Sequence, residues 1–145
     1  MRRLAFALLL PLACCSQPAE LEVQEPWTRD TVGRTASAAV FMTIRSATPD
    51  RLIAASAPIA KRTDLMTLEG GSGAMEMKYL QGIDIPANEP VSLNPTGFHI
   101  WLADLAEPLK AGQTIPLNLR FAKAGEREIT VVVIGPAEAP PSSAS

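Results

Sequence analysis

One histidine and five methionines carry the chemistry that this 145-residue chain offers. His99 is the only histidine, so a zinc site built on a histidine pair is excluded and a hydrolytic triad would depend on that one ring. Residues 70–74 fail the G-x-S-x-G pattern of a nucleophile elbow, because position 74 is alanine. The chain also lacks a glycine-rich phosphate loop. We therefore expect a protein that is not an enzyme.

Both cysteines, Cys14 and Cys15, lie at the amino terminus. The rest of the chain has no thiol for a disulfide, a thiolate metal site or cysteine catalysis. Thioether and imidazole groups are then the available soft ligands, and together they suit Cu(I), a polarisable ion. The residue types favour a soft-metal site over a hydrolytic one.

Residues 1–15 predict a secretory signal peptide, because two arginines precede an apolar run that is shorter than the ~20 residues needed to span a bilayer. The sequence at 12–15, Leu-Ala-Cys-Cys, is similar to the lipobox of bacterial lipoproteins. We expect lipidation at Cys15, since choosing Cys14 would put Pro11 where leucine is usual. The alternative is cleavage after a small residue, which leaves a soluble periplasmic protein. Both predict export to the periplasm or cell envelope.

Composition and charge predict one folded domain that does not bind nucleic acid. Hydrophobic residues make up 47% and charged residues 19% of the chain, which is enough apolar side chain for a core. The net charge is −2 and no block of lysine or arginine occurs, so phosphate neutralisation has no basis. The expected domain is 22–135, between a tether at 16–21 and a disordered tail at 136–145.

Short apolar runs between turn residues predict an all-β domain. Thirteen prolines and nine glycines interrupt these runs, and no helical period is sustained. We expect strands at 21–27, 38–45, 51–57, 62–68, 74–80, 91–94, 98–103, 115–122 and 128–134. Their regular spacing favours an antiparallel β-sandwich.

Alternation along two of these strands groups the candidate side chains. His99 and Trp101 are two residues apart in one expected strand, so they should be neighbours on one face. Met77 and Tyr79 stand in the same relation in another strand. Handing on a bound ion would require a shallow, partly exposed site near loop ends.

Several segments of the chain resemble the periplasmic copper chaperone family PCu(A)C. They are residues 26–29 (Pro-Trp-Thr-Arg), 38–44, 50–56, 58–60, 83–87, 97–99 (Gly-Phe-His), 108–112 and 117–121. The similarity covers nearly the whole expected domain. It implies a cupredoxin-like, Ig-like β-sandwich that binds copper and delivers it to an envelope partner, for instance in the assembly of cytochrome c oxidase.

The metal motif of that family is a histidine, ten residues, a methionine, twenty-one residues, and H-x-M. On this chain the methionine corresponds to Met77 and the second histidine to His99, with the twenty-one-residue spacing kept. Met66 stands where the first histidine is expected, and Trp101 where H-x-M ends. The resemblance thus implies a Cu(I) site of Met66, Met77 and His99 with Trp101 as a cation–π cap, and Ag(I) as the alternative ion.

Each candidate also has a purely structural interpretation. Methionines such as Met66 and Met77 often fill gaps in cores. His99 could be a surface histidine bonded to a backbone carbonyl, and Trp101 could cover the end of the sandwich. Two function hypotheses follow: a Cu(I)-carrying metallochaperone, or a metal-free family member that acts as an envelope binding or assembly protein. A copper-dependent oxidative enzyme is a third, which a single histidine serves poorly.

Overall fold

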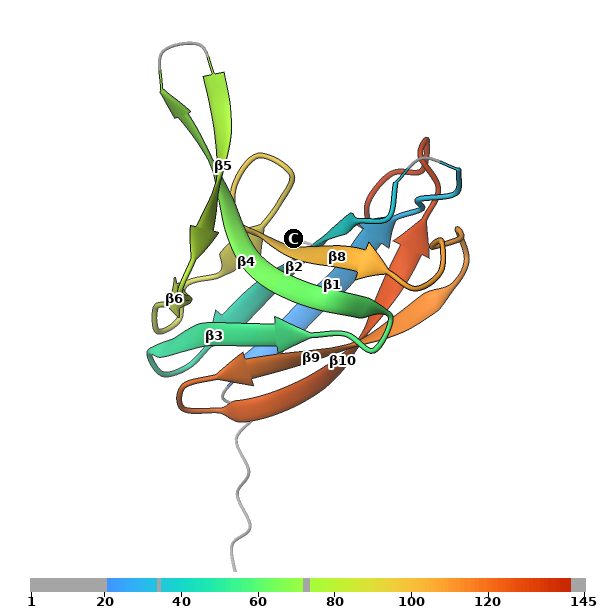
Figure 1. Ribbon diagram of the computed structural model, residues 1–145. Coiled ribbons are helices and arrows are strands. Elements are labelled where there is room, and N and C mark those ends of the chain that lie inside the picture. Colours follow the sequence, from blue (N-terminus) through green and yellow to red (C-terminus); the bar gives the residue numbers. More distant parts are fainter. Residues whose placement is uncertain (1–20, 34, 72–73, 142–145) are drawn as a thin grey trace, which may run out of the picture.

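The computed structural model describes residues 21–33, 35–71 and 74–141. This part of the chain is all-β, as predicted, with ten strands and no helix (Figure 1). No helix within it is long and apolar enough to cross a membrane. The expected signal peptide, which contains Cys15, and residues 16–20 of the expected tether lie outside the described residues, whereas Leu21 is the first residue of the first strand. The strands are β1 (Leu21–Arg29), β2 (Ala38–Ser46), β3 (Asp50–Ser56), β4 (Ala60–Gly71), β5 (Ala74–Leu80), β6 (Ile83–Ile85), β7 (Val91–Leu93), β8 (His99–Leu105), β9 (Thr114–Phe121) and β10 (Gly125–Ile134).

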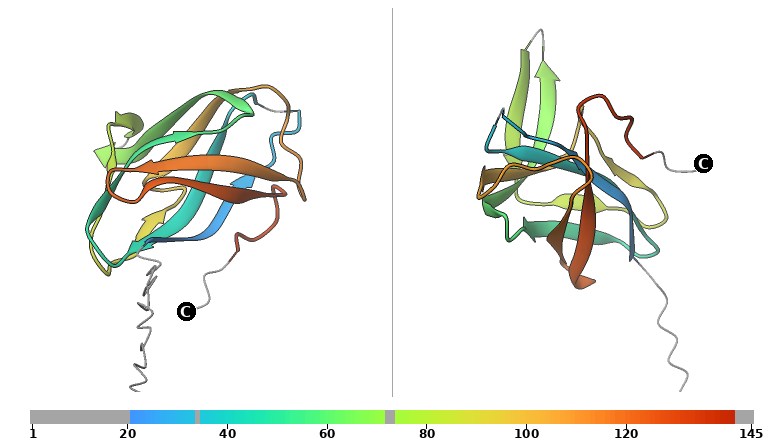
Figure 2. Two further views of the ribbon diagram at one scale, coloured as in Figure 1. Left: turned by 90° about the horizontal axis from the view of Figure 1, so that it is seen from below. Right: turned by 90° about the vertical axis from the view of Figure 1, so that its right-hand side faces the viewer.

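The strands form one continuous hydrogen-bonded sheet in the order β5-β4-β8-β2-β1-β10-β9-β3-β6, with β7 pairing β2 off this path. The sheet curls so that β3, β9 and β10 lie opposite β8 and β2 (Figures 1 and 2). This arrangement confirms the sandwich-like all-β prediction. The paired strands are antiparallel, as expected, except that β1 and β10 pair in parallel. No short turn joins these two strands, so nothing in the connection forces them to be antiparallel.

The core lies between the two halves of the curled sheet. Alternate residues of the central strands point into it, as the two-residue period of a strand requires. In β9 the inward residues are fully or almost fully buried, and the residues between them are more exposed. The largest fully buried side chains are Phe121, Ile44, Leu52, Ile83, Ile85, Ile100, Leu102, Leu109, Leu117, Leu119, Val40 and Val131.

All nine expected strands are present, and one further strand was missed. Strand β6 has three residues between Gly82 and Pro86, and these neighbours are typical of a turn. It nevertheless pairs with β3 and buries two isoleucines. Strand β4 is longer than expected, because its pairing with β5 continues to Gly71 opposite Ala74. The resulting β4–β5 hairpin rises well above the body of the sheet (Figure 1).

A bulge in β1 turns Trp27 to the outer side of the sheet. The register with β2 shifts between Gln24 and Trp27, and Glu25 has a positive φ of 50°. An extra residue in one strand of a pair re-aims the side chains that follow it. Trp27 consequently lies opposite Phe41, and both are buried in a small cluster separate from the main core.

The first residues of the expected tail contact Arg29 at the end of β1. Its Nη1 atom donates to the carbonyl oxygens of Gly135, Pro136 and Glu138, at 3.1, 3.1 and 3.2 Å. The same guanidinium lies 5.3 Å from the ring centroid of Trp27. Residues 142–145 lie outside the described part of the chain.

Candidate metal site

The candidate ligands lie on three adjacent strands where the β4–β5 hairpin leaves the sheet. Strands β4 and β8 pair with Met66 directly opposite His99. Strand β5 then pairs with β4 so that Met77 is opposite Leu68, two residues from Met66 on the same strand. Because alternate residues of a strand share a face, Met66, Met77 and His99 lie on the same face of β5-β4-β8.

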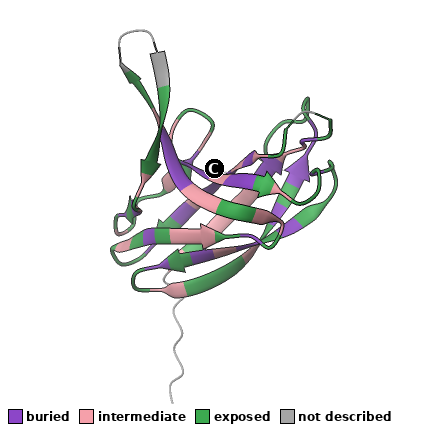
Figure 3. Ribbon diagram, viewed as in Figure 1, coloured by how far each residue is buried: buried purple, intermediate pink, exposed green. Residues whose placement is uncertain are grey.

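Two of the three candidate ligands are buried. His99 is 3% exposed and Met66 is 4% exposed, whereas Met77 is 44% exposed. In Figure 3 the buried part of β4 gives way to exposed chain as the hairpin rises. The shallow, partly exposed site that the sequence predicted is therefore found only at Met77. His99 is not a surface histidine, because it is buried, as is Ile100 on the opposite face of β8.

A backbone carbonyl holds the imidazole of His99. Its Nδ1 atom lies 3.1 Å from the carbonyl oxygen of Gly97, which also accepts the backbone N–H of Leu68 at 3.3 Å. A carbonyl only accepts, so this contact assigns the ring hydrogen to Nδ1 and leaves the lone pair on Nε2. A metal-binding histidine is commonly oriented through its second nitrogen in this way.

The strand pairing places the thioether of Met66 directly opposite this ring, whereas Met77 lies two strands away from it, with β4 between them. Side chains directly opposite each other in an antiparallel pair have Cβ atoms ~4.5–5.5 Å apart, and diagonal neighbours ~7–8 Å apart. Met66 and His99 are in the first relation, and Met66 and Met77 are in the second. Methionine has three rotatable bonds, so its sulfur can adjust over such a gap.

Trp101 lies beside His99, which confirms the neighbourhood predicted from alternation. The two ring centroids are 6.4 Å apart, with an angle of 74° between the ring planes. Trp101 is half-buried and pairs across to Asp64 on β4. The carboxylate of Asp64 accepts a 2.9 Å bond from Arg62 and, together with its charge, raises the pKa of that guanidinium. Trp101 thus lies between the buried residues Met66 and His99 on one side and the charged residues Arg62 and Asp64 on the other.

The side chain of Phe41 belongs to the site and was missed. Its ring centroid is 6.4 Å from His99 and 4.7 Å from Trp27, so it joins the imidazole to the second apolar cluster. Residues 38–44 are almost continuously apolar, which is typical of a strand buried on both faces. That pattern was the available signal for Phe41.

A hollow of about 380 Å³ adjoins the site on the side of Trp101. Its walls include Thr28, Arg29, Ala39, Phe41, Pro95 and Trp101. The described residues hold no group of three or more histidine, cysteine, aspartate or glutamate side chains that could bind a metal. A metal at this place would therefore depend on the thioethers in addition to the single imidazole.

Comparison with known proteins identifies the family. A family model described as "Putative lipoprotein LpqE-like" matches residues 21–133. The chain is similar to "Putative lipoprotein Lxx21020" of Leifsonia xyli subsp. xyli, with 37% identity over 70 residues. That match covers 48% of this chain and 41% of the length of the relative.

Two solved structures share the fold. A copper-bound PCuAC domain from PmoF2 superposes with a TM-score of 0.67 and 25% identity, over 81% of this chain and 94% of that one. The solution structure of CuI-DR1885 from Deinococcus radiodurans gives 0.64 and 26%, over 88% and 89%. The resemblance predicted from the sequence is confirmed. The chain belongs to the LpqE-like family and is a PCuAC-type protein.

Proposed function

We propose that this protein is an exported metallochaperone that binds Cu(I) through Met66, Met77 and His99. The observation that supports it most is the pairing of Met66 with His99, whose Nδ1 is held by Gly97 so that the Nε2 lone pair is available. The two similar structures, a copper-bound PCuAC domain and CuI-DR1885, support the choice of ion.

The donor set suits a soft monovalent ion. Two thioethers and one neutral imidazole match Cu(I), and Ag(I) for the same reason, while Cu(II) prefers tetragonal nitrogen and oxygen ligands. The face of an indole ring attracts a cation within ~6 Å of its centroid. Trp101 would therefore cap the ion where related proteins are expected to place a fourth ligand, and would exclude water from it.

The proposed role is carriage without catalysis, and the destination is an envelope partner. The lipoprotein description of the family and of its relative supports an exported protein, anchored through Cys15. The specific recipient that we propose is cytochrome c oxidase during its assembly. A single imidazole with one nitrogen already bonded offers no acid–base pair for turnover.

An anaerobic Cu(I) titration against a chromophoric chelator tests this function, with tryptophan fluorescence followed in the same cuvette. We expect one ion to be taken up at sub-micromolar free copper, with quenching of the emission. His99→Ala and Met66→Leu should each weaken binding at least ~100-fold, because each removes a ligand.

Met42→Leu is the matched control for Met66→Leu. Met42 is 2% exposed and lies in the main core, so both substitutions exchange a buried thioether for a hydrocarbon of similar volume. The control should bind copper as the unmodified protein does. A folded protein that takes up no copper would leave the metal-free binding or assembly protein as its function.

A further inference from the structure

Strand β5 lies at the edge of the sheet. In the strand order of the described residues its one neighbour is β4. An edge strand presents alternate backbone N–H and C=O groups with which a further strand can pair. Strand β5 contains no proline, so each of its residues has an N–H group. The outer side of the hairpin can therefore accept an added strand.

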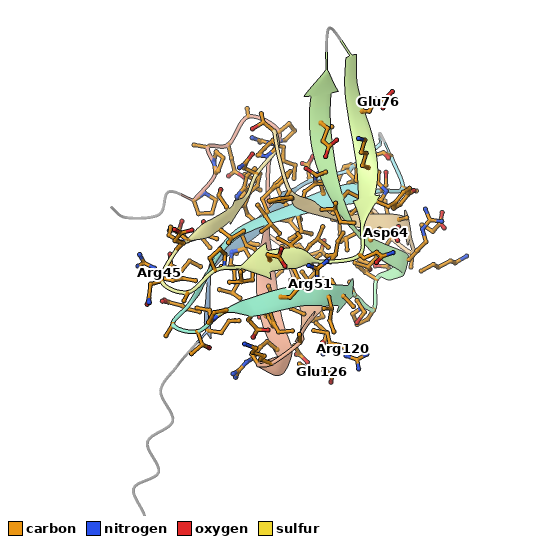
Figure 4. All side chains as sticks on the ribbon, turned by 90° about the vertical axis from the view of Figure 1, so that its left-hand side faces the viewer. Arg45, Arg51, Asp64, Glu76, Arg120 and Glu126 are labelled. Carbon is orange, nitrogen blue, oxygen red and sulfur yellow. The ribbon has the colours of Figure 1, made fainter. Side chains whose placement is uncertain are left out.

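The lysine that would protect this edge is directed elsewhere. Charged side chains on an edge strand, lysine above all, normally discourage pairing with another chain. The Nζ atom of Lys78 lies 2.5 Å from Oε2 of Glu69, which belongs to β4. The ammonium group is thus drawn toward the neighbouring strand, away from the open side. Glu76, labelled in Figure 4, stands farther up the hairpin toward its tip.

The opposite face of β5 presents apolar side chains next to the candidate metal site. Met77 is 44% exposed and Tyr79 is 66% exposed. Tyr79 pairs across to Met66, which is buried, as is His99. Of the three candidate ligands, Met77 is thus the one that a second protein can touch without opening the sheet.

We propose that β5 is the docking strand for the partner that donates or accepts copper. The partner would add an extended segment that pairs with β5 and carries methionine or histidine at alternate positions. Opposite side chains of paired strands have Cβ atoms ~4.5–5.5 Å apart, so a partner sulfur facing Met77 can share the ion with it. This inference rests on the proposed function, because copper gives the partner its soft side chains.

Transfer along this strand is a ligand exchange. The incoming thioether or imidazole donates a lone pair to Cu(I), and the bond to Met77 breaks. The bonds to Met66 and His99 then break in turn as other soft side chains of the partner replace them. The ion stays Cu(I) throughout, so no electron or proton donor is required. The backbone pairing holds the incoming ligand in register while the exchange takes place.

The first test uses amide hydrogen exchange by NMR with a synthetic peptide in which methionine alternates with threonine. We expect alternate amides of β5 to gain protection when the peptide is added, with no such gain at β6, the opposite end of the strand order. Two control peptides carry N-methyl groups on one or the other set of alternate backbone nitrogens. The peptide whose methyl groups replace the N–H groups that face β5 should bind at least ~10-fold more weakly than the unmethylated peptide. The other should bind nearly as well as the unmethylated peptide, because its methyl groups point away from β5.

A second test uses the ion pair that restrains Lys78. Glu69→Gln releases the ammonium to the open edge and should weaken the peptide at least ~3-fold. Adding Lys78→Ala to that variant should restore binding. Equal effects of both N-methyl peptides, or no protection of β5 at millimolar peptide, would overturn the docking strand. Self-association through β5 without peptide would overturn it as well.

Copper measurements separate this inference from the function on which it rests. A peptide with norleucine in place of methionine should protect β5 and take no copper from the loaded protein. If the protein binds copper and β5 stays unprotected, the docking strand is wrong and the carrier function stands. If the methionine peptide protects β5 and the protein binds no copper, the copper function fails and the edge remains a peptide-binding strand.

Discussion

At the scale of single residues, the site is organised by a carbonyl group. Gly97 precedes His99 by two residues and accepts bonds from its ring and from the backbone of Leu68 on the neighbouring strand. One oxygen thereby orients the imidazole and also binds the strand that carries Met66. The same carbonyl thus links the ring of His99 to β4 two residues beyond Met66.

Trp101→Met should tighten Cu(I) binding by ~10-fold or more. The substitution restores the H-x-M ending of the family motif, and a thioether bond replaces an attraction by the indole ring that contributes ~0.5–2 kcal/mol. The chelator competition measures the change. Trp101→Phe keeps an aromatic face and should stay within a few-fold of the unmodified protein. Weaker binding by the methionine variant would contradict the position assigned to Trp101.

At the scale of elements, one carboxylate ties the start of β3 to the turn between β9 and β10. The Oδ1 atom of Asp50 accepts the backbone N–H groups of Arg51 and Lys123, and Oδ2 accepts that of Ala124. Partial burial raises the pKa of Asp50, but these three bonds and the charge of Lys123 outweigh it and hold the pKa below its usual 3.8. The charged form is therefore the one that stabilises the turn.

The stability that Asp50 contributes should depend on pH in one direction. The pKa of Asp50 is lower in the folded state than in the unfolded chain. Its contribution to stability is therefore complete above the pKa that Asp50 has in the unfolded chain, near 4, and is lost as the pH falls through the pKa that it has in the folded protein. Asp50→Asn should lower the free energy of unfolding by ~1 kcal/mol at pH 7 and by less at pH 2. Urea titrations at both pH values measure this.

Asp84→Asn is the control for that titration. Asp84 forms an exposed ion pair with Arg51 at 2.6 Å, and such pairs contribute little. The free energy of unfolding of the Asp84→Asn variant at pH 7 should stay within ~0.5 kcal/mol of that of the unmodified protein. An equal loss in the Asp50 variant at both pH values would mean that the carboxylate charge is not what holds the turn.

At the scale of the whole molecule, β1 connects the two halves of the sheet and also holds the segment after β10. Arg29 donates to three carbonyl oxygens of residues 135–138 while it lies over Trp27. Residues 140 and 141 line a small hollow that Trp27 also borders. The end of the described chain is thus held against the outer face, near the cluster that extends to His99.

Arg29→Lys should loosen that segment without changing copper affinity. A lysine keeps the charge but cannot reproduce the planar guanidinium. We expect amides near Glu138 to exchange at least ~3-fold faster, with the β10 amides unchanged. Hydrogen exchange measured by NMR checks both. If exchange near Glu138 is unaffected, the three bonds do not restrain the segment.

The sequence predicted the fold class and nine of the ten strands because turn residues separate apolar runs clearly. Alternation also placed Trp101 beside His99 correctly. The burial of His99 could not be predicted, because its neighbour Phe41 belongs to β2, and only the register between strands distant in the sequence brings that ring close. Strand β6 was missed because three residues between glycine and proline carry too little local signal.

The parallel pair of β1 and β10 has a consequence for how the chain becomes a domain. A chain made from its amino end produces β1 first and β10 last, and these strands are the seam between the two halves. Until β10 is in place, β1 and β9 each keep one unpaired edge. The sheet is therefore completed in one late step, when β10 pairs with β1. This step joins residues far apart in the sequence, and such pairing is intrinsically slow. A chain that stops before β10 would leave the edges of β1 and β9 open to pairing with other chains, which promotes aggregation.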